Sequence, residues 1–208
     1  MSLILASTSP RRRDLLALLG IPFDVMPPTA EEIPSPMLAP GDQATQFALD
    51  KAQSIAERYT NDLVLGGDTV IDVDGLLLGK PKDLTEAEHM LRQLRGRCHA
   101  VHTGIALLHH ASRTSVAHLA TAWVWMTPFT DDELRRYLKT KESEGKAGAY
   151  SIQGEGARLI EKIEGDYPTI VGLPLRRTAT LLAEHGLAIP HHVEDLYRLK
   201  PYGNWKDF

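Results

Sequence analysis

Residues 3–13, Leu-Ile-Leu-Ala-Ser-Thr-Ser-Pro-Arg-Arg-Arg, form the most informative stretch of this chain. The apolar run predicts a short strand, and Pro10 at the first helical position, with Ser9 as N-cap, predicts that a helix follows the turn. Arginine is unfavourable in a first helical turn because that end of the helix dipole is positive. Backbone amides, hydroxyls and guanidinium groups that converge there suit a polyphosphate. The stretch therefore predicts an anion site; the alternative is a solvated, merely basic helix start.

The overall composition is that of an ordinary globular protein. The chain has 208 residues and a formal net charge of −4, so it has no general attraction to nucleic acid or to anionic membranes. No apolar run approaches the length of a membrane span, and the N-terminal one is too short for a signal peptide. Cys98 is the single cysteine, which excludes an internal disulfide and fits a reducing compartment. We expect a cytoplasmic protein with no nucleic-acid and no membrane partner.

Strand and helix signals alternate along the chain, which predicts an α/β architecture. Strands are expected at 3–5, 63–65, 76–78, 98–109, 114–126 and 158–164, and helices at 10–19, from 42 to about 59, after capping boxes at Thr85 and Thr130, and from Pro174 to near Gly186. No internal repeat interrupts the pattern, so we expect one domain over residues 1–186. The tail over residues 187–208 carries four aromatic residues and is expected to pack against the body or a partner subunit.

Several charged residues interrupt the local pattern. Lys51 lies within the apolar stripe of its helix, so its ammonium group must snorkel to solvent, pair with a carboxylate or point into a cleft. Asp68 follows an apolar strand at its carboxyl end, where open α/β sheets bind their ligands; the alternative is a turn aspartate that accepts hydrogen bonds from backbone amides. Glu32 in a proline-rich loop and Lys80 after a hairpin would, taken alone, be ordinary solvated charges.

Two common nucleotide-binding patterns do not occur in the sequence: the phosphate loop that ends in Gly-Lys-Ser/Thr, and the dinucleotide glycine fingerprint after a strand. The glycines around Gln153 permit close approach of the backbone to a ligand. His99 and His102 are three apart on an expected strand and face opposite sides, and the adjacent pairs His109–His110 and His191–His192 have the same problem, so the histidines do not predict a zinc site.

Six short motifs resemble those of the Maf family of nucleotide pyrophosphatases, and they occur in the family's order. They are Ala6–Arg12, Lys51–Ala52, Gly67–Val70, Gly79–Asp83, Lys146–Tyr150 with Ile152–Gly154, and Val171–Pro174. The resemblance spans nearly the whole chain to about residue 186, and the aromatic tail is an extension beyond it. Lys51, Asp68 and Lys80 each lie inside one of the motifs.

The resemblance implies a two-lobed α/β fold with an elongated mixed sheet flanked by helices, similar to the inosine triphosphatases. It also implies hydrolysis of a nucleoside triphosphate between its α- and β-phosphates, which gives a monophosphate and pyrophosphate. Members of the family need a divalent cation such as Mg²⁺ or Mn²⁺ as cofactor. They commonly form dimers, so a homodimer is expected.

Three positions separate the subfamilies by substrate. Arg11, Thr69 and Gln153 match the subfamily that resembles dTTP/UTP pyrophosphatases; the subfamily acting on 7-methyl-GTP has tryptophan, glutamine and glutamate there. A glutamine amide can donate to and accept from the imide edge of uracil or thymine, whereas a carboxylate suits a cationic methylated guanine. We therefore expect dTTP and UTP, with modified pyrimidine nucleotides as further candidates. The alternatives are 7-methyl-GTP hydrolysis, or regulation of cell division by binding, since the family is associated with septum inhibition.

For this reaction we expect positioning and electrostatic stabilisation to supply most of the rate. Asp68 is the candidate general base, and Lys51 and Lys80 would neutralise phosphate oxygens. The candidate metal ligands are Glu32 and Asp68, and Glu32 is also a candidate catalytic residue. One carboxylate cannot easily be both ligand and free base, so this division stays open. The expected substrate-binding residues are Ser7, Ser9, Arg11, Arg12, Thr69, Lys82 and Gln153.

Overall fold

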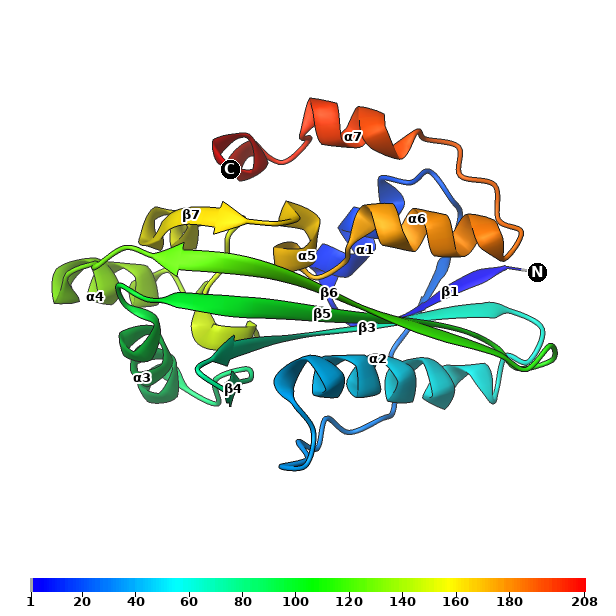
Figure 1. The fold of residues 1–208 in the computed structure, drawn as a ribbon, viewed down its shortest axis with the longest axis horizontal. Helices are drawn as coiled ribbons and strands as arrows, with labels where there is room; N and C mark the ends of the chain where they lie inside the picture. Colours follow the sequence, from blue (N-terminus) through cyan, green and yellow to red (C-terminus); the bar gives the residue numbers. More distant parts are fainter. Residues whose placement is uncertain (1) are drawn as a thin grey trace.

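A long mixed β-sheet runs through the molecule in the computed structural model, which describes residues 2–208 (Figure 1). The strands are β1 (Leu3–Ala6), β2 (Asp24–Met26), β3 (Leu63–Val73), β4 (Leu76–Leu78), β5 (Cys98–His109), β6 (Thr114–Met126) and β7 (Ile160–Glu164). Their order is β2-β1-β3-β5-β6-β7, with β4 paired to β3. β1 is parallel to β2 and β3, and the remaining neighbours are antiparallel. The predicted mixed sheet is confirmed.

Helices cover both faces of this sheet (Figure 1). They are α1 (Pro10–Ala17), α2 (Pro40–Ala56), α3 (Leu84–Leu94), α4 (Asp131–Lys139), α5 (Tyr167–Val171), α6 (Leu175–Glu184) and α7 (Val193–Leu199), with the 3-10 helices η1 (Ala147–Ala149), η2 (Glu155–Leu159) and η3 (Gly203–Asp207). α2 lies on one face, α1, α5 and α6 lie on the other, and α7 lies outside α6 (Figure 1). No helix in residues 2–208 is long and apolar enough to cross a membrane.

Two glycines let α2 lie directly against the sheet. A Cβ atom on Gly66 of β3 would come within 2.2 Å of the Ala48 carbonyl oxygen, and one on Gly104 of β5 within 2.4 Å of the Ala44 oxygen. Any larger residue at either position would push the helix away from the strands. This close approach places Lys51, one turn beyond Ala48, beside β3.

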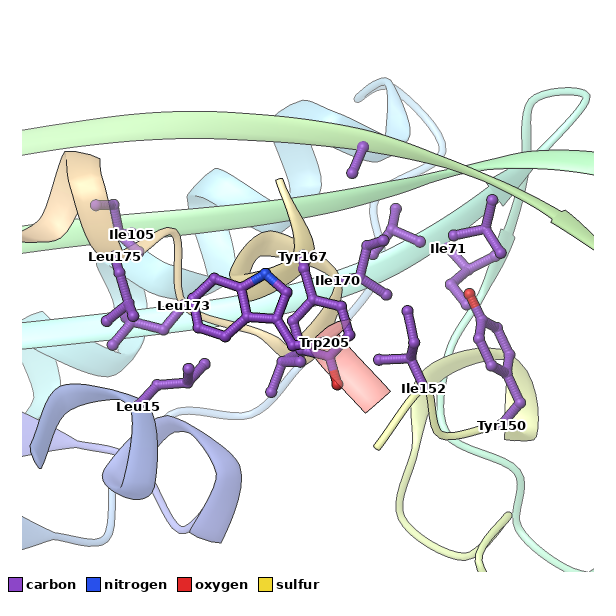
Figure 2. Close-up of a cluster of buried hydrophobic side chains, with 14 of the residues drawn as sticks. Leu15, Ile71, Ile105, Tyr150, Ile152, Tyr167, Ile170, Leu173, Leu175 and Trp205 are labelled. Atoms are coloured by element: carbon purple, nitrogen blue, oxygen red, sulfur yellow. The ribbon is translucent and has the colours of Figure 1, made fainter. Parts of the chain in front are cut away.

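The larger apolar cluster fills the space between the sheet and α1, α5 and α6 (Figure 2). It contains Leu15 of α1, Ile105 of β5 and Leu175 of α6, and Trp205 of the tail, which is only 3% exposed. Each such buried side chain contributes about 1.5–3 kcal/mol relative to an exposed one. The aromatic tail therefore packs against the body of its own chain, which is one of the two arrangements expected.

The helix caps follow the sequence signals with one exception. Ser9 caps α1, since its hydroxyl accepts from the Arg12 amide, and Thr130 with Glu133 forms the predicted capping box of α4. The capping box expected at Thr85 is wrong. α3 begins two residues earlier, at Leu84, and Asp83 is its N-cap, with Oδ1 accepting from the Glu86 amide at 2.8 Å. A short carboxylate at that position reaches the amide better than the Thr85 hydroxyl, which lies inside the first turn.

The observed elements differ from the sequence predictions in length and in number, and the short edge strand β2 was not expected. β3 extends from the predicted residues 63–65 to Val73, because β5 pairs with it across its polar end. α5 and α7 were not expected. α5 has a single turn and a proline at its first positions, and α7 has no buried residue, so neither carries an amphipathic pattern of useful length.

Candidate active site

A cavity of about 630 Å³ lies where the turn after β1, the middle of α2 and β3, and the loop before η2 meet. Ten of the predicted site residues line it: Ser7, Ser9, Arg11, Arg12, Glu32, Lys51, Asp68, Thr69, Lys80 and Gln153. Lys82 is not among the lining residues. It is exposed, and its backbone amide donates to Glu86 Oε2 at the start of α3.

The turn between β1 and α1 is held by its own hydroxyl groups. Ser7 is buried and its Oγ accepts from the Ser9 amide at 3.1 Å, while Ser9 Oγ accepts from the Arg12 amide at 3.4 Å. These bonds fix the N-terminus of α1 against the cavity, which Pro10 and Arg11 also line. The predicted strand-to-helix turn thus opens on a cavity, as an anion site requires.

Arg11 and Arg12 bring two cations to this end of the cavity. Burial, together with the neighbouring Arg12 charge, lowers the pKa of Arg11 to about 10. Within residues 2–208 its guanidinium has no hydrogen-bond or ion-pair partner, so its donors remain available to a ligand. Burial also lowers the pKa of Arg12, and the carboxylate of Asp68 opposes that effect. An anion in the cavity would favour the charged form of both side chains.

Arg12 is fixed by a chain of threonines. Its Nε donates to the Gly172 carbonyl at 2.9 Å and its Nη2 to Thr69 Oγ1 at 3.0 Å. Thr103, fully buried on β5, donates to the Thr169 carbonyl at 2.8 Å. Since that bond uses the Thr103 proton, Thr69 donates to Thr103 across 2.9 Å, and its own oxygen accepts from Arg12. Thr69 therefore holds Arg12 in place as well as lining the cavity.

Lys51 joins two carboxylates at the floor of the cavity. Its Nζ lies 2.5 Å from Asp68 Oδ1 and 2.7 Å from Glu32 Oε1, and Lys80 Nζ lies 2.9 Å from the same Glu32 oxygen. Lys51 and Asp68 are 6% and 3% exposed, so their charges compensate each other in a buried site. Of the three outcomes considered for Lys51, the structure shows pairing at the edge of a cleft.

Glu32 stays ionised because of its two lysine partners. Burial alone would raise the pKa of its carboxyl group, but the hydrogen bonds from Lys51 and Lys80, and their charges, outweigh burial and lower it to about 2. The loop that carries Glu32 has no regular structure. Ion pairs with α2 and with the segment after β4 therefore anchor it at the cavity.

The two carboxylates fit a cation that is shared with a substrate. Residues 2–208 contain no group of three His, Cys, Asp or Glu side chains arranged to hold a metal ion by themselves. Mg²⁺ usually binds through one or two carboxylates together with substrate phosphates, and Glu32 and Asp68 provide that number of hard oxygen donors. Asp68 Oδ1 is engaged by Lys51, whereas Oδ2 has no hydrogen-bond partner within the described chain.

A second group of residues lines the cavity from the segment between α4 and β7. Lys146, Tyr150 and Gln153 lie on the loop that runs through η1 toward η2. Burial, followed by the charge of Arg11, lowers the pKa of Lys146. Lys146 was not among the expected site residues, although it begins one of the six motifs. A lysine in a glycine-bearing loop gives no signal of burial by itself, because burial depends on how the loop folds back.

Tyr150 is held from behind by a neutral histidine. Its hydroxyl lies 2.8 Å from His99 Nε2, and the two rings meet edge to face with centroids 5.5 Å apart. Burial lowers the pKa of His99 to about 4 and raises the pKa of the Tyr150 hydroxyl. Both side chains are therefore uncharged at neutral pH. Tyr150 adds an aromatic surface to the cavity without adding charge.

Gln153 presents an uncommitted amide group in this segment. Its backbone amide donates to Ser151 Oγ at 3.3 Å, and in residues 2–208 its side chain makes no hydrogen bond. The residues after it are anchored by Glu142, whose carboxylate oxygens accept from the Glu155 amide at 3.0 Å and the Gly156 amide at 3.2 Å. The loop is thus fixed while the Gln153 side chain stays free to meet a ligand.

Comparison with known proteins shows which proteins this chain is similar to. Residues 2–185 match the family model described as Maf-like protein. A dTTP/UTP pyrophosphatase of Dictyoglomus turgidum is 45% identical over 188 residues, which are 90% of this chain and 97% of that protein. The dTTP/UTP pyrophosphatases of Symbiobacterium thermophilum and Bacillus cytotoxicus are 46% and 40% identical over 187 and 188 residues, again 90% of this chain and 95% and 97% of theirs.

Among solved structures, a HAM1 protein from Coxiella burnetii is similar with a TM-score of 0.49 and 16% sequence identity. The match covers 88% of this chain and 99% of that one.

Proposed function

The chain belongs to the Maf family, and from this premise we propose that it is a nucleoside triphosphate pyrophosphatase that hydrolyses dTTP and UTP. Water adds to the α-phosphorus and the bond from that phosphorus to the bridging oxygen breaks. The nucleoside monophosphate and pyrophosphate are released with one proton. The match to the family model confirms the resemblance predicted from the six motifs. The enzyme acts in nucleotide metabolism.

One observation carries the proposal: a single cavity combines a cationic helix start with a buried lysine–carboxylate cluster. Arg11, Arg12, Lys51, Lys80 and Lys146 supply five cationic groups to its lining, against the carboxylates of Glu32, Asp68 and Glu144. An excess of positive charge in a partly enclosed site suits a triphosphate. The reaction needs little covalent chemistry from the protein, so fixed cations together with one base are sufficient equipment.

In the proposed mechanism Asp68 takes the proton from the attacking water. Lys51 engages Oδ1, which leaves Oδ2 as the atom available for the proton. Lys51 and Lys80 then stabilise the charge that grows on the phosphate oxygens, while Arg11, Arg12 and the start of α1 hold the triphosphate chain. Ser7 and Ser9 complete that turn.

A divalent cation such as Mg²⁺ or Mn²⁺ belongs to the proposal as cofactor. Glu32 and Asp68 are the residues that would hold it together with phosphate oxygens, and when bound it would supply neutralisation of the pyrophosphate leaving group. The two roles of Asp68 are alternatives, because an Oδ2 atom that holds the cation is not free to take the proton. Lys51 lies between the same two carboxylates, so the lysine and the cation compete for their oxygens. Metal affinity should therefore depend on the phosphates of the substrate.

The base end of the cavity, formed by Lys146, Tyr150 and Gln153, supports a pyrimidine over 7-methylguanine. The Gln153 amide can pair with the imide edge of uracil or thymine, and Lys146 is a cation beside it whose pKa the charge of Arg11 helps to lower. A methylated guanine is itself cationic, so the Lys146 cation would repel it. Regulation of cell division by binding alone would not require the cluster of Lys51 and Asp68.

Pyrophosphate release with Mg²⁺ or Mn²⁺ across dTTP, UTP, CTP, ATP, GTP and 7-methyl-GTP tests the proposal. Fast release from dTTP and UTP supports both the reaction and the substrate. Preference for 7-methyl-GTP would keep the chemistry and overturn the role given to Gln153. Absence of release from every nucleotide would favour the binding protein.

We propose further that the protein is a homodimer located in the cytoplasm. Leu119 and Trp123 lie on the same face of β6, two pleats apart, and both are exposed. Exposed large apolar side chains on a sheet face favour a second copy as partner. Sedimentation of the wild-type chain and of a Leu119→Glu, Trp123→Glu variant tests this: a wild-type monomer would exclude the dimer.

A further inference from the structure

The tail is tied into the core although it lies outside the segment that matches the family model. The match ends at residue 185, whereas α7 and η3 follow it. Trp205 of η3 stacks on Tyr167 of α5, with ring centroids 5.3 Å apart and planes 9° from parallel, and Tyr197 of α7 meets Trp205 edge to face at 5.1 Å (Figure 2 shows the first pair). Aromatic contacts of this geometry stabilise the attachment beyond the burial of apolar area.

A polar contact fixes the tail to the same short helix. The Tyr197 hydroxyl donates to Asp166 Oδ1 at 2.7 Å, and Asp166 Oδ2 caps α5 by accepting from the amide and the hydroxyl of Thr169. The next two residues of α5, Ile170 and Val171, line the cavity. The tail therefore contacts an element that forms part of the active-site wall.

Asn204 extends this attachment to the loop that carries Gln153. Its Nδ2 donates to the Ile152 carbonyl and to the Gly154 carbonyl, both at 3.1 Å, so it holds the backbone on either side of Gln153. Glu142 binds the amides of the residues that follow. The Gln153 loop is thus held both by a carboxylate of the family-matched body and by an amide of the tail.

We propose that Asn204 is a positioning residue for base selection, and that the tail acts as a strap that orients Gln153 toward the pyrimidine. This inference rests on the proposed function. Without Asn204 the two carbonyl groups would turn to water and the loop would sample further conformations, only some of which point the Gln153 amide at the base. The phosphate-binding residues lie on other elements and would keep their geometry.

The test compares Asn204→Ala and Asn204→Asp with Lys206→Ala, an exposed neighbour in η3. Asn204→Asp keeps the size of the side chain but cannot donate. For both Asn204 variants we expect the preference for UTP over CTP, measured as the ratio of kcat/KM, to fall about five- to tenfold, since two hydrogen bonds are lost. The change should appear in KM for UTP, with kcat altered less than twofold, and Lys206→Ala should match the wild type.

Amide hydrogen exchange of residues 151–156 gives a readout that does not need turnover. Faster exchange there in Asn204→Ala, with an unchanged melting temperature, supports the strap. Unchanged exchange together with unchanged UTP preference would overturn it. An equal fall in kcat on all nucleotides with a lower melting temperature would also overturn it, because that is the result of a merely structural role.

The two proposals can fail separately. A wild-type protein that releases no pyrophosphate from UTP or dTTP contradicts the proposed function, and the exchange experiment still decides whether Asn204 fixes the loop. A wild type that prefers UTP, with an Asn204→Ala variant of equal preference, contradicts the strap alone.

Discussion

The two ends of the cavity are built differently. At the phosphate end, Arg11, Lys51 and Asp68 lie on regular elements, namely the first turn of α1, the middle of α2 and the middle of β3. At the base end, Lys146 and Gln153 lie on a loop of 3-10 turns that is held by side chains distant in sequence. The residues proposed for the chemistry common to all nucleoside triphosphates thus lie on helices and strands, while the residue proposed for substrate choice lies on a loop.

This difference implies that changes at the phosphate end should reduce turnover for every nucleotide, whereas changes at the base end should redistribute activity among nucleotides. Loops held by a few side chains can move without loss of the fold, and elements packed on both faces cannot. The variants below separate the two ends, beginning with the largest expected effect.

Asp68→Asn should reduce kcat about 10³-fold on dTTP and UTP alike, because a base for the attacking water contributes a factor of this order. The amide keeps the size of the side chain, so nucleotide binding measured by calorimetry should stay close to that of the wild type. Turnover within tenfold of the wild type would remove Asp68 from the catalytic role.

Lys80→Ala and Lys82→Ala form a matched pair from one motif. Lys80 lines the cavity and pairs with Glu32, whereas Lys82 is exposed and lies outside the lining. We expect Lys80→Ala to lower kcat roughly 10- to 100-fold, as removal of one charge-stabilising group does, and Lys82→Ala to change it less than twofold. A strong effect of Lys82→Ala in steady-state assays would restore its predicted substrate contact and require the segment to move.

Gln153→Glu should act on the base end alone. A carboxylate cannot donate to the carbonyl of uracil, so we expect kcat/KM for UTP to fall about tenfold or more, with a smaller change for nucleotides that do not use this contact. The measurement is pyrophosphate release over the same six nucleotides. An unchanged ranking would show that Gln153 does not read the base.

The smallest effect concerns pH. The pKa of Glu32 is lowered to about 2, so its ion pairs stabilise the fold fully above the unfolded value near 4.5 and are lost as pH falls through the folded value. Glu32→Gln should therefore flatten the fall in unfolding free energy between about pH 4.5 and 2, by about 1 kcal/mol after allowance for solvent screening of this partly exposed group. Urea titrations of both proteins at several pH values measure it, and identical slopes would contradict the assignment.

Sequence patterns predicted one end of the site better than the other. The strand, cap and proline around Ser9 predicted α1 and its anion-facing turn, and a lysine within an apolar stripe predicted a group aimed at a partner. Local rules suffice there because helix caps and helical periodicity are set within a few residues. The predicted site residues did not include Lys146, which lines the cavity, and did include Lys82, which does not. In a loop, the neighbouring residues in the sequence do not determine whether a side chain is buried or in which direction it points.

Composition and motif order alone determined the class of fold and the family, and they predicted the residues that we propose for the phosphate chemistry. The spacing of apolar residues and the capping residues determine where helices and strands form. Each helix or strand then determines which of its side chains share a face. Only the tertiary structure decided that Lys51 joins Glu32 to Asp68, that Thr69 and Thr103 hold Arg12, and that Asn204 reaches the Gln153 loop. These contacts join residues 17 to 57 positions apart, and such contacts form only when packing of the whole chain brings the groups together.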